Sequence, residues 1–131
     1  MADPVATLDH MGISVSDFDK AKAFYVPALA PLGMAVLMEF PTPAGNAMGM
    51  GPPGAPFLWI MAGAKQTPRA HFAIRARSRK DVDAFYAAAI KAGGKDNGPP
   101  GLRPHYHPDY YAAFVLDPDG NNVEAVSHAP G

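Results

Sequence analysis

Two segments of the chain align with each other along their whole length. Residues 10–33 match residues 71–94 without a gap, and seven of the 24 aligned pairs are identical. The identities include an opening histidine, at His10 and His71, a Phe-Tyr pair in the middle and a glycine at the end. Agreement among residues of such different chemistry indicates a duplicated unit, because unrelated strand-helix units share only an apolar pattern. The chain is therefore expected to hold two similar modules.

Each copy shows the pattern of a strand followed by a helix. The apolar runs at 6–15 and 70–76 are each followed by a segment whose apolar residues recur with the helical period. Helices are expected to begin near Asp17 and Ser78, since both residue types accept hydrogen bonds from free N–H groups at a helix start. Pro27 is expected to kink or shorten the first helix, because proline lacks the N–H that the helix ladder uses.

Further strand-like runs follow each helix, at 34–40, 57–63, 110–117 and 121–128. The Gly- and Pro-rich stretches 41–56 and 94–109 are interpreted as loops between strands, and Asp117-Pro118-Asp119-Gly120 as a tight hairpin turn. We predict an α+β fold of two tandem modules, each read as βαβββ, although the runs above supply only two of the three strands that follow each helix. We expect a single domain over the whole chain, with modules at 6–63 and 68–128.

Composition narrows the classes of function. Lys and Arg number 11 and Asp and Glu 12, a balance that argues against a nucleic-acid partner. The absence of cysteine excludes a disulfide scaffold, a thiolate zinc site and a cysteine nucleophile, and it fits a reducing cytoplasm. No signal peptide is visible, and the longest apolar run is far shorter than the ~20 residues of a membrane helix. We expect a cytoplasmic protein without a membrane partner.

Three residues of the duplicated pattern suit metal binding. His10 and His71 are equivalent, so they approach one another if the halves pack about a pseudo-twofold axis. Glu124 stands among apolar residues of the last strand, where an ionised carboxylate needs a partner. Two imidazoles and one carboxylate form the facial triad of non-haem iron and also suit zinc, nickel or manganese sites with open positions. The alternative is a packing role for the histidines and a solvent-facing glutamate.

Three segments, "LDHMGISVSDFDKAKAFYVPAL", "AHFAIRA" and "FVLDPDGNNVEAV", together resemble the vicinal oxygen chelate superfamily. This superfamily groups glyoxalase I, extradiol dioxygenases, fosfomycin-resistance proteins and bleomycin-resistance proteins. The resemblance covers about residues 6–128, and "DPDGNNVE" is its most specific part. It implies paired βαβββ modules, each with its sheet curled around a cup. It also implies His10, His71 and Glu124 as ligands of a divalent metal ion, either Zn, Ni, Mn or Fe(II).

The sequence departs from several branches of that superfamily. Glyoxalase I enzymes typically add a glutamate ligand on the strand equivalent to "FLWIMAG", where Ile60 or a neighbour stands here, and Glu39 lies on an earlier strand. Three protein ligands plus water are therefore expected. Fosfomycin-resistance proteins add a serine-rich loop that this sequence lacks. Bleomycin-binding relatives generally lack the metal triad, so its presence argues against that class.

The extradiol dioxygenase pattern is partly retained. The segment "HPDYYAAFVLDPDGNNVE" keeps His107, Asp117-Pro118, Gly120 and Glu124 at matching spacing. Phe114 occupies the place of a tyrosine that can hydrogen-bond the bound catechol oxygen in that family. Phenylalanine cannot form this bond, which weakens the prediction of ring cleavage.

The segment "RPHYHPDYY" combines polar and aromatic residues and is predicted to form a lid over the metal. The histidines of this lid, His105 and His107, would share a face if the segment were extended, and either is a candidate proton shuttle. Tyr110 is a further candidate catalytic residue, while Arg103 and Tyr111 are candidates for holding the substrate. The alternatives are an ordinary surface loop and a rival ligand set of His105, His107 and His128, which lacks the repeat relation.

Apolar side chains are predicted to line the rest of the cup. Trp59 and Met61 alternate with Leu58 and Ile60, so one of the two pairs faces the cup and the other the core. Trp59 and Phe114 are therefore added as candidate substrate contacts, with plain core packing as the alternative.

These observations predict a divalent-metal-dependent lyase or isomerase of the glyoxalase type. Its substrate would be a small molecule that chelates the metal through two adjacent oxygens. An iron-dependent dioxygenase and a protein that binds a small molecule without catalysis are the alternatives. The resemblance also implies a homodimer, in which His10 and His71 of one site come from the same subunit or from different subunits.

Overall fold

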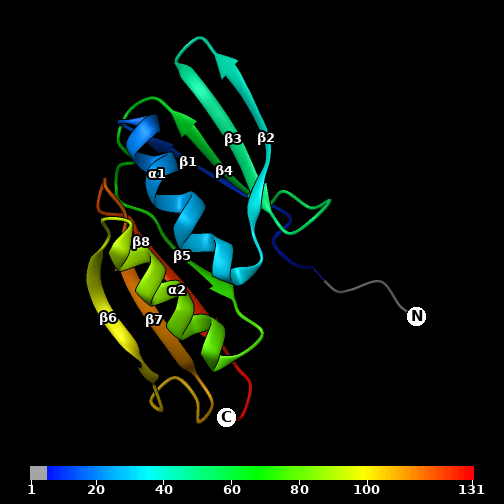
Figure 1. Ribbon diagram of the computed structural model, residues 1–131, viewed down its shortest axis with the longest axis vertical. Helices are drawn as coiled ribbons and strands as arrows, with labels where there is room; N and C mark the ends of the chain where they lie inside the picture. The colour runs from blue at the N-terminus through cyan, green and yellow to red at the C-terminus, as the bar shows by residue number, and fades with distance from the viewer. Residues whose placement is uncertain (1–5) are drawn as a thin grey trace.

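The computed structural model describes residues 6–131 and contains two four-stranded sheets and two α-helices (Figure 1). The first half comprises β1 (Met11–Val15), α1 (Phe18–Leu29), a 3₁₀ turn (Ala30–Leu32), β2 (Ala35–Thr42), β3 (Gly45–Gly51) and β4 (Leu58–Ala62). The second half comprises β5 (His71–Arg75), α2 (Arg79–Lys91), β6 (Lys95–Leu102), β7 (Tyr111–Leu116) and β8 (Asn122–Ser127). The α+β fold of two tandem βαβββ modules is confirmed. The first five residues, which the predicted single domain includes, lie outside the described residues.

The two sheets have the same strand order. The first runs β1-β4-β3-β2 and the second β5-β8-β7-β6, with β1/β4 and β5/β8 parallel and the other pairs antiparallel. The register also repeats, because Gly12 pairs with Trp59 as its equivalent Ala73 pairs with Glu124. Since 73 minus 12 and 71 minus 10 both equal 61, the repeat seen in sequence extends to the strand pairing. A position in one sheet therefore identifies its counterpart in the other.

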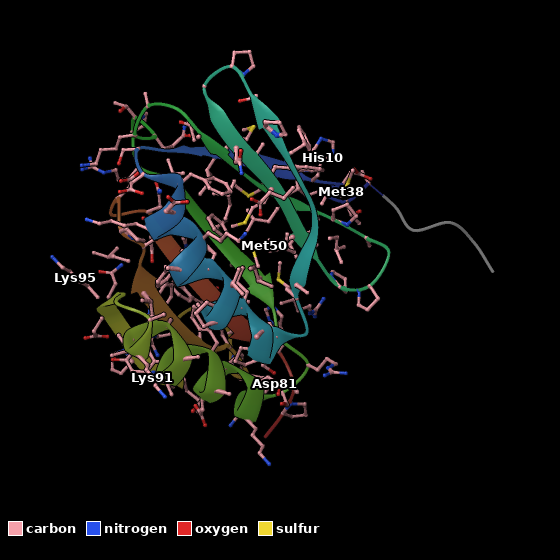
Figure 2. All side chains as sticks on the ribbon, turned by 45° about the horizontal axis from the view of Figure 1, so that its top comes forward. His10, Met38, Met50, Asp81, Lys91 and Lys95 are labelled. Carbon is pink, nitrogen blue, oxygen red and sulfur yellow. The ribbon has the colours of Figure 1, made fainter. Side chains whose placement is uncertain are left out.

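The helices cover one face of each sheet and leave the other face open. Alternate strand residues such as Ile13, Ile60 and Val123 are buried against the helices, as period-two alternation requires. Met50 lies on this covered side, whereas Met38 and His10 lie on the far side of the first sheet (Figure 2). The sheets do not close into barrels. We call the uncovered sides the first and second open faces.

Both helices begin where the sequence predicts. The Asp17 carboxylate accepts a hydrogen bond from the N–H of Lys20, and the Ser78 hydroxyl accepts one from Asp81. These caps satisfy backbone donors that have no partner within the helix. The first helix includes Pro27 and ends two residues later, where the 3₁₀ turn continues the chain.

The prediction that the Gly- and Pro-rich stretches are loops is wrong for part of each. Within 41–56, β3 is an inner strand, which is possible because its methionines pack into the core while its glycines and alanine face the open side. Within 94–109, β6 contains Pro99 and Pro100, which are tolerated because β6 is an edge strand and both fall in the irregularity between Gly98 and Gly101, where neither is paired with β7. Composition alone concealed both strands.

The two halves meet along their helices and at the predicted turn. Figure 1 shows α1 and α2 side by side, and they contact one another directly. The Tyr25 hydroxyl of α1 donates to the Asp117 carboxylate at 2.6 Å, and Ser16 donates to Asp119 through both its N–H and its hydroxyl. The turn itself is confirmed by the hydrogen bond from the Gly120 N–H to the Asp117 carbonyl. Among residues 6–131, no helix is long and apolar enough to span a membrane.

Candidate functional site

The second open face carries a buried carboxylate with two side-chain partners. Glu124 of β8 is only 2% exposed. Its Oε1 lies 2.9 Å from Nε2 of His71 on the neighbouring strand β5, and the Tyr110 hydroxyl donates to its Oε2. Both carboxylate oxygens are therefore satisfied, which is the condition for keeping an ionised carboxylate away from water. His71 and Glu124, two of the three predicted metal ligands, lie together.

The spacing of this pair fits a metal ion. Two ligand atoms that each lie about 2.1 Å from one ion, at right angles, are about 3 Å apart. The separation of 2.9 Å between His71 Nε2 and Glu124 Oε1 is an ordinary hydrogen-bond length and also has this value, so an ion can take the place of the shared proton. The His71 side chain is 55% exposed, so the imidazole is accessible from solvent. A neutral imidazole beside a carboxylate is also a chemically suitable donor set for zinc, nickel, manganese or ferrous iron.

Residues 103–110 fold over the second open face beside Glu124. They form turns rather than a strand, since the N–H of Tyr106 donates to the Arg103 carbonyl and that of Tyr110 to the His107 carbonyl. The prediction that His105 and His107 share one face depended on an extended segment and does not hold. His105 instead packs against the Tyr106 ring, at 4.3 Å between centroids.

His107 forms an imidazole pair with His128, its partner in the rival ligand set, and His105 does not join them. Its Nε2 lies 2.6 Å from Nδ1 of His128, and the two rings are stacked. Its Nδ1 accepts the N–H of Asp109, so the proton of a neutral His107 resides on Nε2 and is donated to His128. The Tyr110 ring packs edge-on against both imidazoles. His107 is thus linked to Glu124 through Tyr110.

The environment shifts the pKa of two groups in this cluster. Burial raises the pKa of Tyr110 well above its usual value, and its hydrogen bond to Glu124 and the charge of that carboxylate raise it further. Burial lowers the pKa of His128, and the nearby positive charge of Arg75 lowers it as well. At neutral pH Tyr110 is therefore a hydrogen-bond donor and His128 is held in its neutral form.

The candidate substrate contacts of the second half lie in different places. The Arg103 guanidinium lies over the Phe114 ring and donates to the carbonyls of Pro99 and Gly101. Phe114 lies 6.3 Å from the His71 ring, on the open face. Tyr111, predicted as a substrate contact, instead donates to Asp83 of α2 at 2.6 Å and lies on the covered face. The strand alternation that puts Phe114 on the open face puts Tyr111 on the other.

His10, the third predicted ligand, lies at the first open face. Its imidazole is 61% exposed, with Nδ1 2.6 Å from the Asp9 carboxylate. Beside it is a cavity of about 610 Å³, lined by His10, Gly12, Phe40, Pro56, Trp59 and Met61. Within residues 6–131 no three His, Asp or Glu side chains are close enough to hold a metal together. One chain therefore does not assemble the predicted triad.

Strand register identifies the counterpart of Glu124 in the first half. Trp59 pairs with Gly12 and Gly49, as Glu124 pairs with the equivalent Ala73 and with Phe114. The counterpart is therefore Trp59, a neighbour of the Ile60 named from the sequence, and it cannot ligate a metal. Glu39 lies elsewhere, bonded to Lys22 of α1 and to Asn46. Trp59 and Met61 face the open side, while Leu58 and Ile60 are buried in the core.

Comparison with solved structures places this fold among known ones. The chain is 29% identical to a glyoxalase/bleomycin resistance protein from Albidiferax ferrireducens T118, with a TM-score of 0.72 over 93% of this chain and 98% of that one. It is 25% identical to the E144Q glyoxalase I mutant from Zea mays, with a TM-score of 0.71, and it spans 98% of its own length but 49% of that chain. A glyoxalase/bleomycin resistance protein/dioxygenase family enzyme from Burkholderia phytofirmans PsJN, 20% identical, has the same fold, with a TM-score of 0.67 over 95% of this chain and 100% of that one.

No curated protein matches the chain in sequence. The sequence pattern of one family does match, and it covers residues 7–125, nearly the whole of both modules. The repeated βαβββ topology, the structural likenesses and this match agree with one another. The chain belongs to the Glyoxalase/Bleomycin resistance protein/Dioxygenase superfamily.

Proposed function

We propose that the protein is a divalent-metal-dependent lyase or isomerase of the glyoxalase type. Its substrate is a small molecule that binds the metal through two adjacent oxygens. The observation that carries the proposal is the geometry of His71 and Glu124, whose ligand atoms lie 2.9 Å apart on the open face. A catalytic metal site needs such protein ligands together with open positions for water or substrate.

The third ligand in this proposal comes from a second copy of the chain. His10 is the repeat-equivalent of His71 but lies at the first open face, apart from the His71–Glu124 pair. A homodimer that sets the first open face of one subunit against the second open face of the other would bring the three side chains together. Closed twofold dimers form two such sites at once, because each contact occurs twice. His10, His71 and Glu124 would then hold the ion.

When bound, the metal would act as a Lewis acid that stabilises negative charge on a substrate oxygen. The protein's own groups orient and exchange protons around it. Tyr110 fixes the Glu124 carboxylate through Oε2 and leaves Oε1 for the ion. His107 holds a proton at Nε2 that it shares with His128, and we assign it the role of proton shuttle. Arg103 is assigned to the substrate, beside Phe114.

The direct test is elemental analysis of protein purified without an affinity tag. The proposal expects about one divalent ion per chain, with loss of that ion in a folded His71→Ala variant. Protein carrying the metal found is then assayed with a panel of 1,2-dicarbonyl compounds and catechols. Isomerisation of a 1,2-dicarbonyl compound without oxygen uptake supports the proposal. Metal-dependent oxygen consumption with a catechol would instead identify a dioxygenase, for which Phe114 lacks the expected hydroxyl.

A non-catalytic binding protein is the second candidate. The observation in its favour is that a single chain assembles only two of the three ligands among residues 6–131. In that case the native protein would be well folded and free of metal, and it would bind a small molecule on an open face. Metal content therefore separates the two candidates before any substrate is known.

A further inference from the structure

We propose that the first open face is a binding subsite for an uncharged, planar aromatic group, which packs against the indole of Trp59. This inference deepens the proposed function, because it names an aromatic group as part of the substrate. It rests on the proposed function only for the rest of the ligand, the two adjacent oxygens that bind the metal. The subsite is the cavity of about 610 Å³ beside His10. Its volume falls within the range of about 300–1,000 Å³ that is typical of small-molecule sites.

The lining of the cavity disfavours a charged ligand. Apart from His10, the residues around it are Gly12, Phe40, Pro56, Trp59 and Met61, all of which are apolar. Phe40 and Met61 are 42% and 38% exposed, which is high for side chains of this type. Exposed apolar groups that gather on one face usually mark a binding site. Among residues 6–131, His10 is the one ionisable residue in the lining, and its Nδ1 already pairs with the Asp9 carboxylate.

The Trp59 ring packs against one defined position of the neighbouring strand. Its cross-strand neighbour on β3 is Gly49, and a Cβ added there would lie 2.7 Å from the nearest indole carbon. The ring therefore rests on bare backbone, which no larger residue would allow. Phe40 stands beside it at 6.1 Å between centroids and at 57°, a tilted arrangement that leaves the rings unstacked. Trp59 is half-buried, so part of its surface remains available to a ligand.

Comparison of the two halves shows how this face differs from its twin. Trp59 stands where the second half has Glu124, and Gly49 stands where it has Phe114. One open face thus presents a carboxylate and an imidazole, and the other presents an indole and a thioether beside the imidazole of His10. If the two faces meet in a dimer, a single ligand lies between a polar wall and an aromatic wall. A substrate that carries its vicinal oxygens on or next to an aromatic ring fits both.

Trp59 is the only tryptophan of the chain, which makes the test specific. The indole N–H of ¹⁵N-labelled, metal-free protein gives one cross-peak, and 2-naphthol is titrated against it. Stacking on Trp59 is expected to move this peak, because the ring current of the naphthol reaches the indole. Cyclohexanol is the matched probe, since it is apolar and carries a hydroxyl but has no aromatic ring, and it is expected to leave the peak in place.

Variants separate ring stacking from simple apolar contact. Isothermal titration calorimetry is expected to give an affinity for 2-naphthol that Trp59→Phe changes by less than about threefold and Trp59→Leu lowers by about tenfold. Far-UV circular dichroism verifies that both variants are folded. Equal affinity in Trp59→Leu and the wild type overturns the proposal, as does a response to cyclohexanol as large as that to 2-naphthol. An indole peak that moves with protein concentration but not with 2-naphthol also overturns it, and assigns the face to contact between subunits.

The outcome is independent of the metal. The titration uses metal-free protein and so needs no bound ion, and Glu39→Gln is the control expected to keep the affinity for 2-naphthol, because Glu39 pairs with Lys22 on the covered face. A native protein without metal that still binds 2-naphthol through Trp59 would refute the proposed enzyme and retain the aromatic subsite. A metal-containing enzyme whose Trp59 peak does not respond to 2-naphthol would support the proposed enzyme and refute the aromatic subsite.

Discussion

His71 and Glu124 face one another from neighbouring parallel strands, with the imidazole Nε2 2.9 Å from the carboxylate Oε1. The backbone sets this distance, because Glu124 pairs with Ala73 and His71 is the next residue of β5 on the same face. Only the histidine is accessible, while the carboxylate is buried and held from its other side by Tyr110. The pair is therefore organised before any ligand arrives.

Replacing Glu124 with glutamine tests the charge of this carboxylate. Glutamine has nearly the same shape, so the fold is expected to persist, but it supplies no negative charge to a cation. We expect the affinity for the divalent metal to fall by at least about 100-fold, beyond the loss typical of removing an outer-shell partner. Equilibrium dialysis measures it. Glu39→Gln is the matched control, since Glu39 pairs with Lys22 on the covered face, and it is expected to bind metal normally. Retained affinity in Glu124→Gln would exclude Glu124 as a ligand.

Replacing Tyr110 with phenylalanine removes one hydroxyl that orients Glu124. The ring contacts with His107 and His128 are kept, but Oε2 loses its donor. Metal affinity or turnover is expected to fall by about 10- to 100-fold, as for other outer-shell partners. Tyr106→Phe is the control, because Tyr106 is 58% exposed and packs against Tyr110 without bonding to Glu124. If both variants behave alike, Tyr110 does not position the carboxylate.

A shared site makes a quantitative prediction for mixed dimers. His10→Ala and Glu124→Gln are each expected to be inactive alone. After unfolding and refolding of an equal mixture, half of the dimers carry one chain of each kind, and each of these has one intact site. About a quarter of the wild-type activity and metal content should return, since closed dimers contain two equivalent sites. Each variant refolded alone is the control. Sites built within one chain would give no recovery.

Sequence patterns predicted the strands whose residues alternate or form apolar runs. These are β1, β2, β4, β5, β7 and β8, and the helix starts at Asp17 and Ser78 also followed from cap chemistry. The strands β3 and β6 were missed, because glycine and proline usually mark loops. What permits them is tertiary: the Trp59 ring fills the space above Gly49, and β6 lies at a sheet edge. Neither condition is visible along the chain.

The candidate site was predictable where it follows from strand register and not where it follows from turns. His71 and Glu124 meet because they lie on adjacent strands of one module. The pairing of His107 with His128 depends on the turns of residues 103–110, which spacing does not encode. The separation of His10 from the pair depends on how the two modules are joined, since they pack through their helices rather than face to face. The sequence repeat predicted that His10 and His71 occupy equivalent positions, but equivalent positions in two modules need not lie close together.

The joint between the modules is itself open to test. Tyr25 is fully buried in α1, and its hydroxyl donates to Asp117, which is 5% exposed and also accepts bonds from Asp119 and Asn121. Tyr25→Phe leaves the packing intact but removes a donor to a buried carboxylate. The free energy of unfolding is expected to drop by about 1–3 kcal/mol. Tyr106→Phe, at an exposed position, is expected to change it little.

The stabilisation by Tyr25 should also disappear at high pH. Burial raises the pKa of Tyr25 well above its usual value of about 10, and the negative charge of Asp117 raises it further. The folded protein then keeps this proton at a pH where the unfolded chain has released it. The stabilising contribution of Tyr25 is therefore fully present below about pH 10, and above that pH it falls by about 1.4 kcal/mol per pH unit. Tyr86, Tyr110 and Tyr111, whose pKa values are also raised, contribute equally to the wild type and the variant. Urea unfolding near pH 8 and near pH 11 measures this effect. The difference in the free energy of unfolding between the wild type and Tyr25→Phe should shrink as the pH rises. A constant difference would mean that the Tyr25 hydroxyl ionises as readily in the folded protein as in the unfolded chain.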